Sequence, residues 1–206
     1  MSIYQPSDDS DLLCESILTF KNKNVLEIGI GSGIILRTLS NQNNTVIGID
    51  INPESLSFVS SSLEKLNLAD NVDLVLGDGP SMFVSQTFDL IVFNPPYLPR
   101  DAYTDITTDG GNTGLEITDN WIKLSLSLIK KSGKIELDSK TKLQEYSLKR
   151  FKKLPTYKVL SYKGPQHNPS YKVSVKIYNS KFFYGVGNSK KIAEHDAAKK
   201  LLKDLK

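Results

Sequence analysis

The first residues whose types and spacing could do chemistry are three closely spaced glycines. Gly29, Gly31 and Gly33 follow the short apolar run at residues 24–28. Because they lack Cβ atoms, they let the backbone turn sharply and approach a ligand closely. Their G-x-G-x-G spacing differs from the G-x-G-x-x-G pattern that places a dinucleotide pyrophosphate on a helix end. The spacing therefore favours a nucleoside-containing cofactor without a diphosphate.

A second group of chemically suggestive residues is Asn94-Pro95-Pro96-Tyr97, which follows the apolar run at residues 88–93. The two proline rings fix φ and remove two backbone donors, so the loop offers carbonyl acceptors beside the amide of Asn94. Acceptors that converge on one spot suit the two hydrogens of a planar NH2 group, and Tyr97 would cover the flat face of that group. The motif therefore predicts a pocket for a planar nitrogen.

The elements that must position these motifs alternate between apolar strands and helical patterns. The predicted strands are residues 24–28, 45–49, 72–76 and 88–93, and helices are expected from 34 onward and from 53 to 66. Asp50, directly after the second strand, is placed to accept both hydroxyls of a ribose. This order predicts an α/β Rossmann-like domain with a parallel sheet, whose ligands gather at the carboxyl ends of the strands.

Together these motifs resemble the signature of S-adenosylmethionine-dependent methyltransferases that act on planar nitrogen. The matching residues, in chain order, are 25–33, Asp50, Asp78 and 94–97. The opening at residues 4–13 looks like the start of the short HemK-like glutamine N5-methyltransferases of archaea and eukaryotes, which modify the Gly-Gly-Gln tip of translation release factors. Residues 110–116 resemble the glycine-rich substrate segment of that family. The resemblance covers about residues 3–137.

The resemblance implies a site for S-adenosylmethionine and a site for the substrate nitrogen. Asn94 and the carbonyl group of Pro95 would hold that nitrogen, with Tyr97 stacked on it. Methyl transfer would be a direct in-line displacement by nitrogen, so most of the catalysis would be alignment of the two reactants. The implied cofactor-binding residues are Asp9, Ser10, Glu27, Gly29, Gly31, Gly33, Asp50, Asp78 and Asn94.

After this segment the sequence departs from the family. Residues 121–129 predict an amphipathic helix, and residues 133–137 predict the beginning of a fifth strand. Members of the family continue for about two more strands and a helix, so the resemblance implies an incomplete version of a seven-stranded sheet. Such a sheet would leave one edge bare. A small activator subunit that shields this edge is therefore a candidate partner.

The charge of the chain changes sign after residue 137. Residues 1–137 hold 9 Lys and Arg against 18 Asp and Glu, whereas residues 138–206 hold 17 against 5. The two parts therefore carry −9 and +12, which together give the +3 of the whole chain. We predict two domains, 1–137 and 138–206, the first suited to a small ligand and the second to a polyanion.

The second module predicts the order helix, three strands, helix. Helical spacing covers residues 140–151 and resumes from 189, and strands are expected at 156–162, 171–178 and 181–187. Apolar and polar residues alternate through the middle strand, as in a sheet with one solvated face. Residues 179 and 180, Asn-Ser, are expected to form a two-residue hairpin turn.

These elements resemble the double-stranded RNA-binding domain, particularly the one at the end of ribonuclease III. The matching pieces are residues 141–146, 155–157, 164–167 and 187–194. The resemblance implies three contact regions on A-form RNA, which recognise shape and 2′-hydroxyl groups rather than sequence. The contact residues would be Gln144 and Glu145 in one minor groove, His167 in the next, and Lys190 and Lys191 on the phosphates between them. The acidic metal-binding signature of ribonuclease III does not occur in residues 1–137.

The composition of the chain indicates in which compartment the protein works and which sites it lacks. No apolar stretch approaches the ~20 residues needed to cross a bilayer, and the amino terminus lacks a signal-peptide pattern, so we expect a cytoplasmic protein without a membrane partner. The single cysteine, Cys14, excludes an internal disulfide and a multi-cysteine zinc site. We expect no metal site and a buried or half-buried Cys14.

Two classes of function remain open at this point. The chain is either a methyltransferase or a non-catalytic double-stranded RNA-binding protein with a remnant methyltransferase domain. An enzyme could methylate a protein glutamine of a release factor, as the resemblance implies, or the exocyclic amine of an RNA adenine. An adenine in a duplex would have to leave its stack to reach the pocket.

Overall fold

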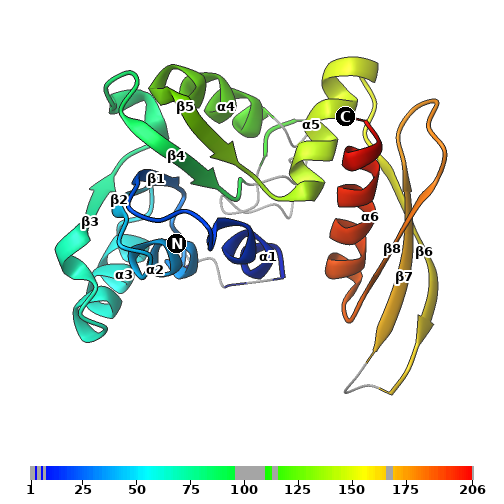
Figure 1. Ribbon diagram of the computed structural model, residues 1–206, viewed down its shortest axis with the longest axis horizontal. Helices are drawn as coiled ribbons and strands as arrows, with labels where there is room; N and C mark the ends of the chain where they lie inside the picture. Colours follow the sequence, from blue (N-terminus) through cyan, green and yellow to red (C-terminus); the bar gives the residue numbers. More distant parts are fainter. Residues whose placement is uncertain are drawn as a thin grey trace. The chain divides into compact units, whose positions relative to one another are not determined.

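The computed structural model describes residues 3, 6, 8–95, 110–112, 116–165 and 169–205. Contacts within the chain divide it into two compact units, residues 1–137 and 138–206, and each is described by itself (Figure 1). Tyr97 and His167 lie outside the described residues.

Unit 1 contains a five-stranded parallel sheet with the order β3-β2-β1-β4-β5 (Figure 1). The central strand, residues 24–28, and its neighbour at residues 88–93 are short apolar runs with little exposed surface, as the sequence predicts for a sheet covered on both faces. The strands are β1 (Asn24–Ile28), β2 (Thr45–Asp50), β3 (Val72–Leu76), β4 (Phe88–Phe93) and β5 (Ile129–Glu136). The prediction of a parallel α/β sheet is confirmed.

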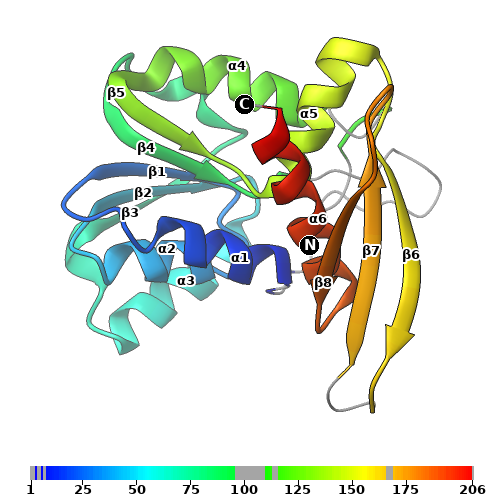
Figure 2. The same ribbon diagram turned by 45° about the vertical axis from the view of Figure 1, so that its right-hand side comes forward.

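Helices cover both faces of this sheet. Figure 2 shows α1 (Asp8–Ile17), α2 (Ile34–Ser40) and α3 (Pro53–Lys65) on one face and α4 (Glu116–Leu128) on the other. Each face has its own apolar cluster, one built around α1 to α3 and one built around α4. Two short 3-10 helices, Ala69–Asn71 and Pro80–Met82, precede and follow β3.

One helix and two element boundaries in unit 1 differ from the sequence predictions. The α1 helix was not predicted, because only Leu13 and Ile17 form its fully buried apolar face and the rest of its sequence is polar or half-buried. The α4 helix begins at Glu116 instead of residue 121. The β5 strand begins at Ile129 instead of residue 133, because Ile129 already pairs with Phe88 before an irregularity in the ladder.

The two edges of the sheet have different characters. The β5 edge carries exposed Lys131 and Lys134, and lysines on an edge strand discourage pairing with another strand. The β3 edge ends in Leu76, which is 58% exposed, and Met82 and Val84 beyond it are also exposed. The apolar edge of the described sheet is therefore the β3 edge.

Unit 2 has the predicted helix, three strands and helix. The strands form an antiparallel sheet with the order β6-β7-β8, and α5 and α6 share one apolar cluster with it. Side chains cap both helices: Asp138 accepts bonds from Lys140 N and Thr141 N, and Ser189 accepts one from Ile192 N. The elements are α5 (Ser139–Phe151), β6 (Thr156–Lys163), β7 (Ser170–Lys176), β8 (Phe183–Gly187) and α6 (Lys190–Asp204).

The turn between β7 and β8 corrects the sequence prediction. The β7 strand ends at Lys176 and the β8 strand begins at Phe183, so the connection between them is longer than the two residues of the predicted hairpin turn. Its hydrogen bond joins Ser180 N to Ile177 O at 3.1 Å, and Asn179 has a φ of 60°. The turn is therefore centred on residues 178 and 179. The Ser180 hydroxyl also accepts a hydrogen bond from Ile177 N, and the β7 strand ends at the residue before Ile177.

Close packing of α6 on β8 explains the small residues of both elements. A Cβ atom at Gly185 would overlap the backbone of Ala193 and Ala197. Both alanines are fully buried, so the helix backbone lies almost directly on the strand. The edge of β8 is also occupied, since Val186 N donates to Asp196 Oδ2 and Lys200 Nζ donates to Tyr184 O.

Candidate active site and RNA interface

The register of unit 1 brings the predicted site residues to one edge of the sheet. Ile28 pairs with Ile49 on one side and with Phe93 on the other, so β1, β2 and β4 end at the same level. Asp50 pairs with Leu76, which aligns the end of β3 with them. The residues that follow these strands therefore lie along the carboxyl edge, namely Gly29, Asp50, Asp78 and Asn94.

The glycine turn after β1 holds the side chain of Asp50. Gly31 N donates to Asp50 Oδ2 at 2.9 Å, and Asn52 N donates to Asp50 Oδ1 at 2.8 Å. Gly29, Gly31 and Gly33 all have positive φ values of 76°, 49° and 71°, which side chains rarely adopt. Each Asp50 oxygen keeps a lone pair, so the fixed carboxylate can still accept a pair of hydroxyl groups.

Glu27 is a buried acid without a hydrogen-bond partner for one oxygen. Its side chain is 1% exposed, and within the described residues Oε2 forms no hydrogen bond. Burial raises the pKa of Glu27 well above its usual range, and the nearby negative charge of Asp50 raises it further. Such a group fits a ligand that brings a positive charge or a hydrogen-bond donor to this edge.

Asn94 presents a second buried acceptor at the end of β4. Its Oδ1 atom is buried, and no hydrogen-bond partner for it occurs in the described part of the chain. The following residue, Pro95, is buried and has no N–H of its own. An unpaired amide oxygen beside a proline can accept a hydrogen bond from an incoming N–H group. Whether Tyr97 stacks on that group stays a prediction.

The remaining cofactor candidates lie in two places. Asp78 is exposed just beyond β3, and Asp9 and Ser10 are buried in the first turn of α1. The α1 helix packs against α2, which follows the glycine turn. That Asp9 and Ser10 lie beside the methionine end of a cofactor stays a prediction.

In unit 2, the predicted lysine pair lies in the first turn of α6. The side chain of Lys190 is 62% exposed, and its Nζ is 3.8 Å from Glu194 Oε1. Lys191 is half-buried. Unpaired backbone N–H groups at a helix start attract phosphate, and the two ammonium groups add to that attraction. This helix end is therefore suited to a polyanion backbone.

The two predicted minor-groove residues of α5 differ in exposure. Gln144 is half-buried, whereas Glu145 is 7% exposed and forms an ion pair with Lys149. A buried acid that is already paired presents little of itself to RNA, so Glu145 is a poorer candidate than Gln144.

An ion pair connects the starts of the two helices. Lys140 Nζ is 2.7 Å from Glu194 Oε2, and their side chains are 22% and 8% exposed. The same ammonium group lies 5.6 Å from the ring centre of Tyr157. Burial raises the pKa of Tyr157, so its hydroxyl group stays protonated. The pair fixes the spacing between two predicted contact regions.

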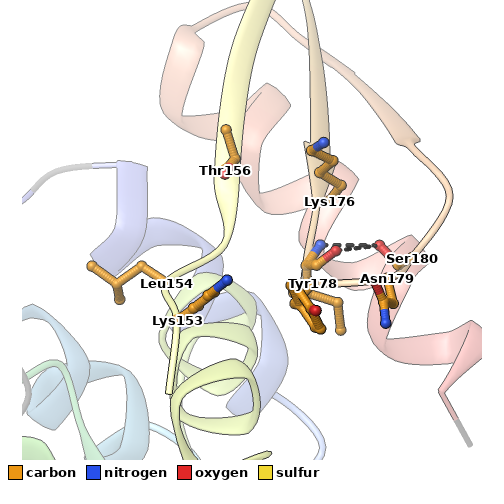
Figure 3. Close-up of a pocket in the computed structure, with 8 residues that line it drawn as sticks. Lys153, Leu154, Thr156, Lys176, Tyr178, Asn179 and Ser180 are labelled. Atoms are coloured by element: carbon orange, nitrogen blue, oxygen red, sulfur yellow. Dashed lines mark hydrogen bonds between the residues drawn. The ribbon is translucent and has the colours of Figure 1, made fainter. Parts of the chain in front are cut away.

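A separate hollow lies where the α5–β6 connection meets the β7–β8 turn (Figure 3). Its volume is about 390 Å3, and it is lined by Lys153, Leu154, Thr156, Lys176, Ile177, Tyr178, Asn179 and Ser180. None of the predicted RNA contacts belongs to it. The cation of Lys153 lies 4.4 Å from the ring centre of Tyr178, which holds that lysine against the turn.

Known proteins resemble both units. A model of the methyltransferase domain matches residues 25–107, and a model of the double-stranded RNA binding motif matches residues 139–205. A protein of Methanocaldococcus jannaschii, provisionally named a protein N5-glutamine methyltransferase, is 35% identical over 144 residues. That match covers 66% of this chain and 71% of the relative.

The chain belongs to the S-adenosylmethionine-dependent methyltransferase family.

This methyltransferase chain also resembles ribonuclease 3 of Pelagibacter ubique, with 50% identity over 93 residues. The chain spans 42% of the length of that ribonuclease. The methyltransferase and ribonuclease matches cover 66% and 45% of the chain, so together they span more than its length and share at least about a tenth of it. The carboxyl-terminal unit carries the double-stranded RNA-binding motif, as predicted.

A solved structure supports the fold of the methyltransferase unit. The Mtq2–Trm112 complex of E. cuniculi has a TM-score of 0.53 with 20% sequence identity. The likeness covers 86% of this chain and 100% of that chain.

Sequence reasoning missed one residue at the carboxyl edge. Trp121 was assigned only to an amphipathic helix, yet its indole occupies the space that side chains at Gly29 and Gly79 would need. The signal available in the sequence was its identity as the single tryptophan of the chain.

Within the described ranges, no helix is long and apolar enough to cross a membrane, and no three potential metal ligands cluster. Cys14 is half-buried, as expected, and burial raises the pKa of its thiol.

Proposed function

We propose that unit 1 transfers a methyl group from S-adenosylmethionine to a planar NH2 nitrogen, while unit 2 holds the enzyme on double-stranded or structured RNA. The observation that carries this proposal is the buried Oδ1 atom of Asn94 beside Pro95, for which the described residues provide no hydrogen-bond partner. Leaving a buried acceptor unpaired costs about 1–3 kcal/mol, so its retention at a sheet edge favours a donor from a ligand.

The residues of the carboxyl edge fit the proposed cofactor. Asp50 is held with one free lone pair on each oxygen for the ribose hydroxyls, and Glu27 offers an unpaired acceptor for the amino group. When bound, S-adenosylmethionine supplies an electrophilic methyl group. The glycine turn brings the backbone close to this ligand.

The reaction needs alignment more than acid–base chemistry. The Asn94 amide oxygen and the Pro95 carbonyl oxygen would accept the two hydrogens of the substrate NH2 group and point its lone pair at the methyl group. Holding two reactants in line supplies most of the rate in such a reaction. The side chain of Tyr97 would cover the other face of the nitrogen.

We propose a release-factor glutamine as the acceptor. The support is the family of the M. jannaschii relative, whose name specifies protein glutamine N5. The RNA-binding motif favours a second candidate, the exocyclic amine of an adenine in structured RNA. Both acceptors occur in the cytoplasm, which is where we place the protein.

A small activator subunit is the proposed partner of unit 1. The support is the apolar β3 edge, where Leu76 is 58% exposed and Met82, which lies against Gly77 just after the strand, is 53% exposed. The solved Mtq2 structure is that of a complex with Trm112. Covering the β3 edge would add strand pairing and bury these side chains.

The test uses the full chain and methyl-labelled cofactor. The purified protein is incubated with release factor, with structured RNA, and with both, and an Asn94→Ala variant serves as control. Label on the factor or on the RNA supports the proposal and selects the acceptor. Calorimetry with S-adenosylhomocysteine, carried out in parallel, separates failure of cofactor binding from failure of substrate choice. A chain that binds RNA but no cofactor would make unit 1 a remnant and overturn the proposed activity.

A further inference from the structure

The α4 helix places an aromatic ring across the ends of three strands. The Trp121 indole lies against Gly29, which follows β1, and against Gly79, which lies beyond β3. It also packs edge-to-face on Phe93 at the end of β4, with ring centres 5.7 Å apart and planes at 83°. The ring therefore lies at the edge that carries the proposed cofactor-binding residues.

The backbone makes room for this ring at two glycines. A Cβ atom at Gly79 would lie 2.9 Å from Trp121 Nε1, which is closer than real contacts allow. A Cβ atom at Gly29 would lie 3.5 Å from Trp121 Cη2, in van der Waals contact. Both glycines have positive φ values, 74° and 76°. Gly79 directly follows Asp78, so this predicted cofactor residue and the indole are neighbours.

Contact with Phe93 fixes the indole, and part of the Trp121 side chain stays exposed. Phe93 is fully buried, whereas Trp121 is half-buried and packs against the α4 cluster. A rigid, partly exposed aromatic side chain at the proposed nucleoside-binding edge is suited to a flat heterocycle, because stacking orders few additional torsions.

We propose that Trp121 contacts the cofactor and forms the apolar surface against which its adenine ring packs. This inference rests on the proposed function, since it concerns the same cofactor. Asp50 and Glu27 would fix the polar parts of the ligand, and Trp121 would hold the base. Gly79 is the residue that admits the indole to this position.

The first experiment uses the protein without substitution. Trp121 is the single tryptophan, so its emission reports this position alone. Titration of the full chain with S-adenosylhomocysteine should change the tryptophan emission, and the change should saturate with the dissociation constant that calorimetry gives. Binding by calorimetry without any change of emission would overturn the proposal and leave the proposed function intact.

The second experiment uses three variants. Trp121→Ala should raise the dissociation constant of S-adenosylhomocysteine about tenfold or more, since loss of base stacking costs about this much. Trp121→Phe keeps a ring and should raise it less than about threefold. Leu126→Ala, at a 63% exposed position of the same helix, should leave it unchanged. Equal binding by wild type and Trp121→Ala would overturn the proposal, and no binding by wild type would instead overturn the proposed function.

Discussion

The predicted ligand sites of the two units differ in how their buried acceptors are paired. In unit 1, Glu27 Oε2 and Asn94 Oδ1 are buried without a hydrogen-bond partner in the described residues. In unit 2, the buried carboxylate of Glu194 is paired with Lys140 at 2.7 Å, and buried Asp138 caps α5. The predicted small-ligand site of unit 1 therefore keeps two buried acceptors open, whereas the two acids at the helix starts of unit 2 are satisfied within the protein.

This difference follows from the size of the ligand that each unit is built to hold. A small ligand enters the protein, so the acceptors that recognise it must be left free until it binds. A duplex RNA stays outside and is recognised by the spacing of several surface contacts, so the protein must fix that spacing itself. Internal pairs such as Lys140–Glu194 can do so, and the charges predicted to contact RNA are on exposed side chains such as Lys190.

The largest effect should come from removing one of the two open acceptors of unit 1. Asn94→Ala removes the amide oxygen that would orient the substrate nitrogen, and methyl transfer should fall about 100- to 1000-fold, as for loss of one aligned group in a catalytic site. The initial rate of label transfer measures this. Asn41→Ala, at an exposed position at the end of α2, is the matched control and should keep full activity. Equal rates for the two variants would remove Asn94 from the site.

The next effect should come from the packing that fixes unit 2. Gly185→Ala places a Cβ atom into the backbone of Ala193 and Ala197, which a change of rotamer cannot relieve. The expected cost is about 3 kcal/mol of unfolding free energy for unit 2, together with loss of RNA binding. Far-ultraviolet circular dichroism in urea measures it. Val186→Ala, at a 53% exposed neighbour, should change stability by less than about 0.5 kcal/mol.

Elements that depend on neighbouring residues in the sequence could be predicted, whereas features that depend on contacts between residues far apart in the sequence could not. Strands β1 to β4 were predictable because each is an apolar run closed by glycine or polar residues, a local signal. The α1 helix was not, because its stability depends on packing Leu13 and Ile17 into a cluster formed by distant residues. The Lys140–Glu194 ion pair joins residues that are 54 positions apart, and no local sequence pattern predicts it.

The candidate site shows the same division. The glycine turn, Asp50 and Asn94 could be placed on one edge because parallel strands carry their ligands at their carboxyl ends. Trp121 could not, because its contact with Gly79 depends on how α4 crosses the sheet. Glu145 was predicted to contact RNA, and the sequence did not show that it is 7% exposed and paired with Lys149, so this contact stays a prediction.

A smaller effect should come from the exposed charges of unit 2. The double variant Lys190→Gln with Lys191→Gln removes two phosphate contacts while keeping the side-chain length similar. Affinity for a duplex of ~16 base pairs should fall about tenfold, and the slope of log affinity against log salt should become shallower by about 1 per lost contact. Fluorescence anisotropy at several salt concentrations measures both. Lys199→Gln, an exposed lysine farther along the same helix, should leave the slope unchanged if α6 contacts RNA through its start.

The smallest effect concerns the open acid of unit 1 and tests the comparison through pH. Burial raises the folded-state pKa of Glu27, so the folded protein holds this proton at pH values where the unfolded chain has released it. Stability should therefore fall as pH rises above about 4.3, the ordinary value for glutamate, until the folded value is reached. The side chain of the Glu27→Gln variant cannot ionise, so the variant does not lose stability as pH rises through this range.

The variant and the wild type should thus be about equally stable in acid, and the variant should become the more stable of the two as pH rises towards neutral. Urea titrations followed by Trp121 emission report unit 1 alone, because the single tryptophan lies there. A stability difference that stays constant between pH 4 and 8 would mean that Glu27 is stabilised by the fold after all. In that case its carboxylate would resemble the paired Glu194 of unit 2 and not an acceptor kept open for a ligand.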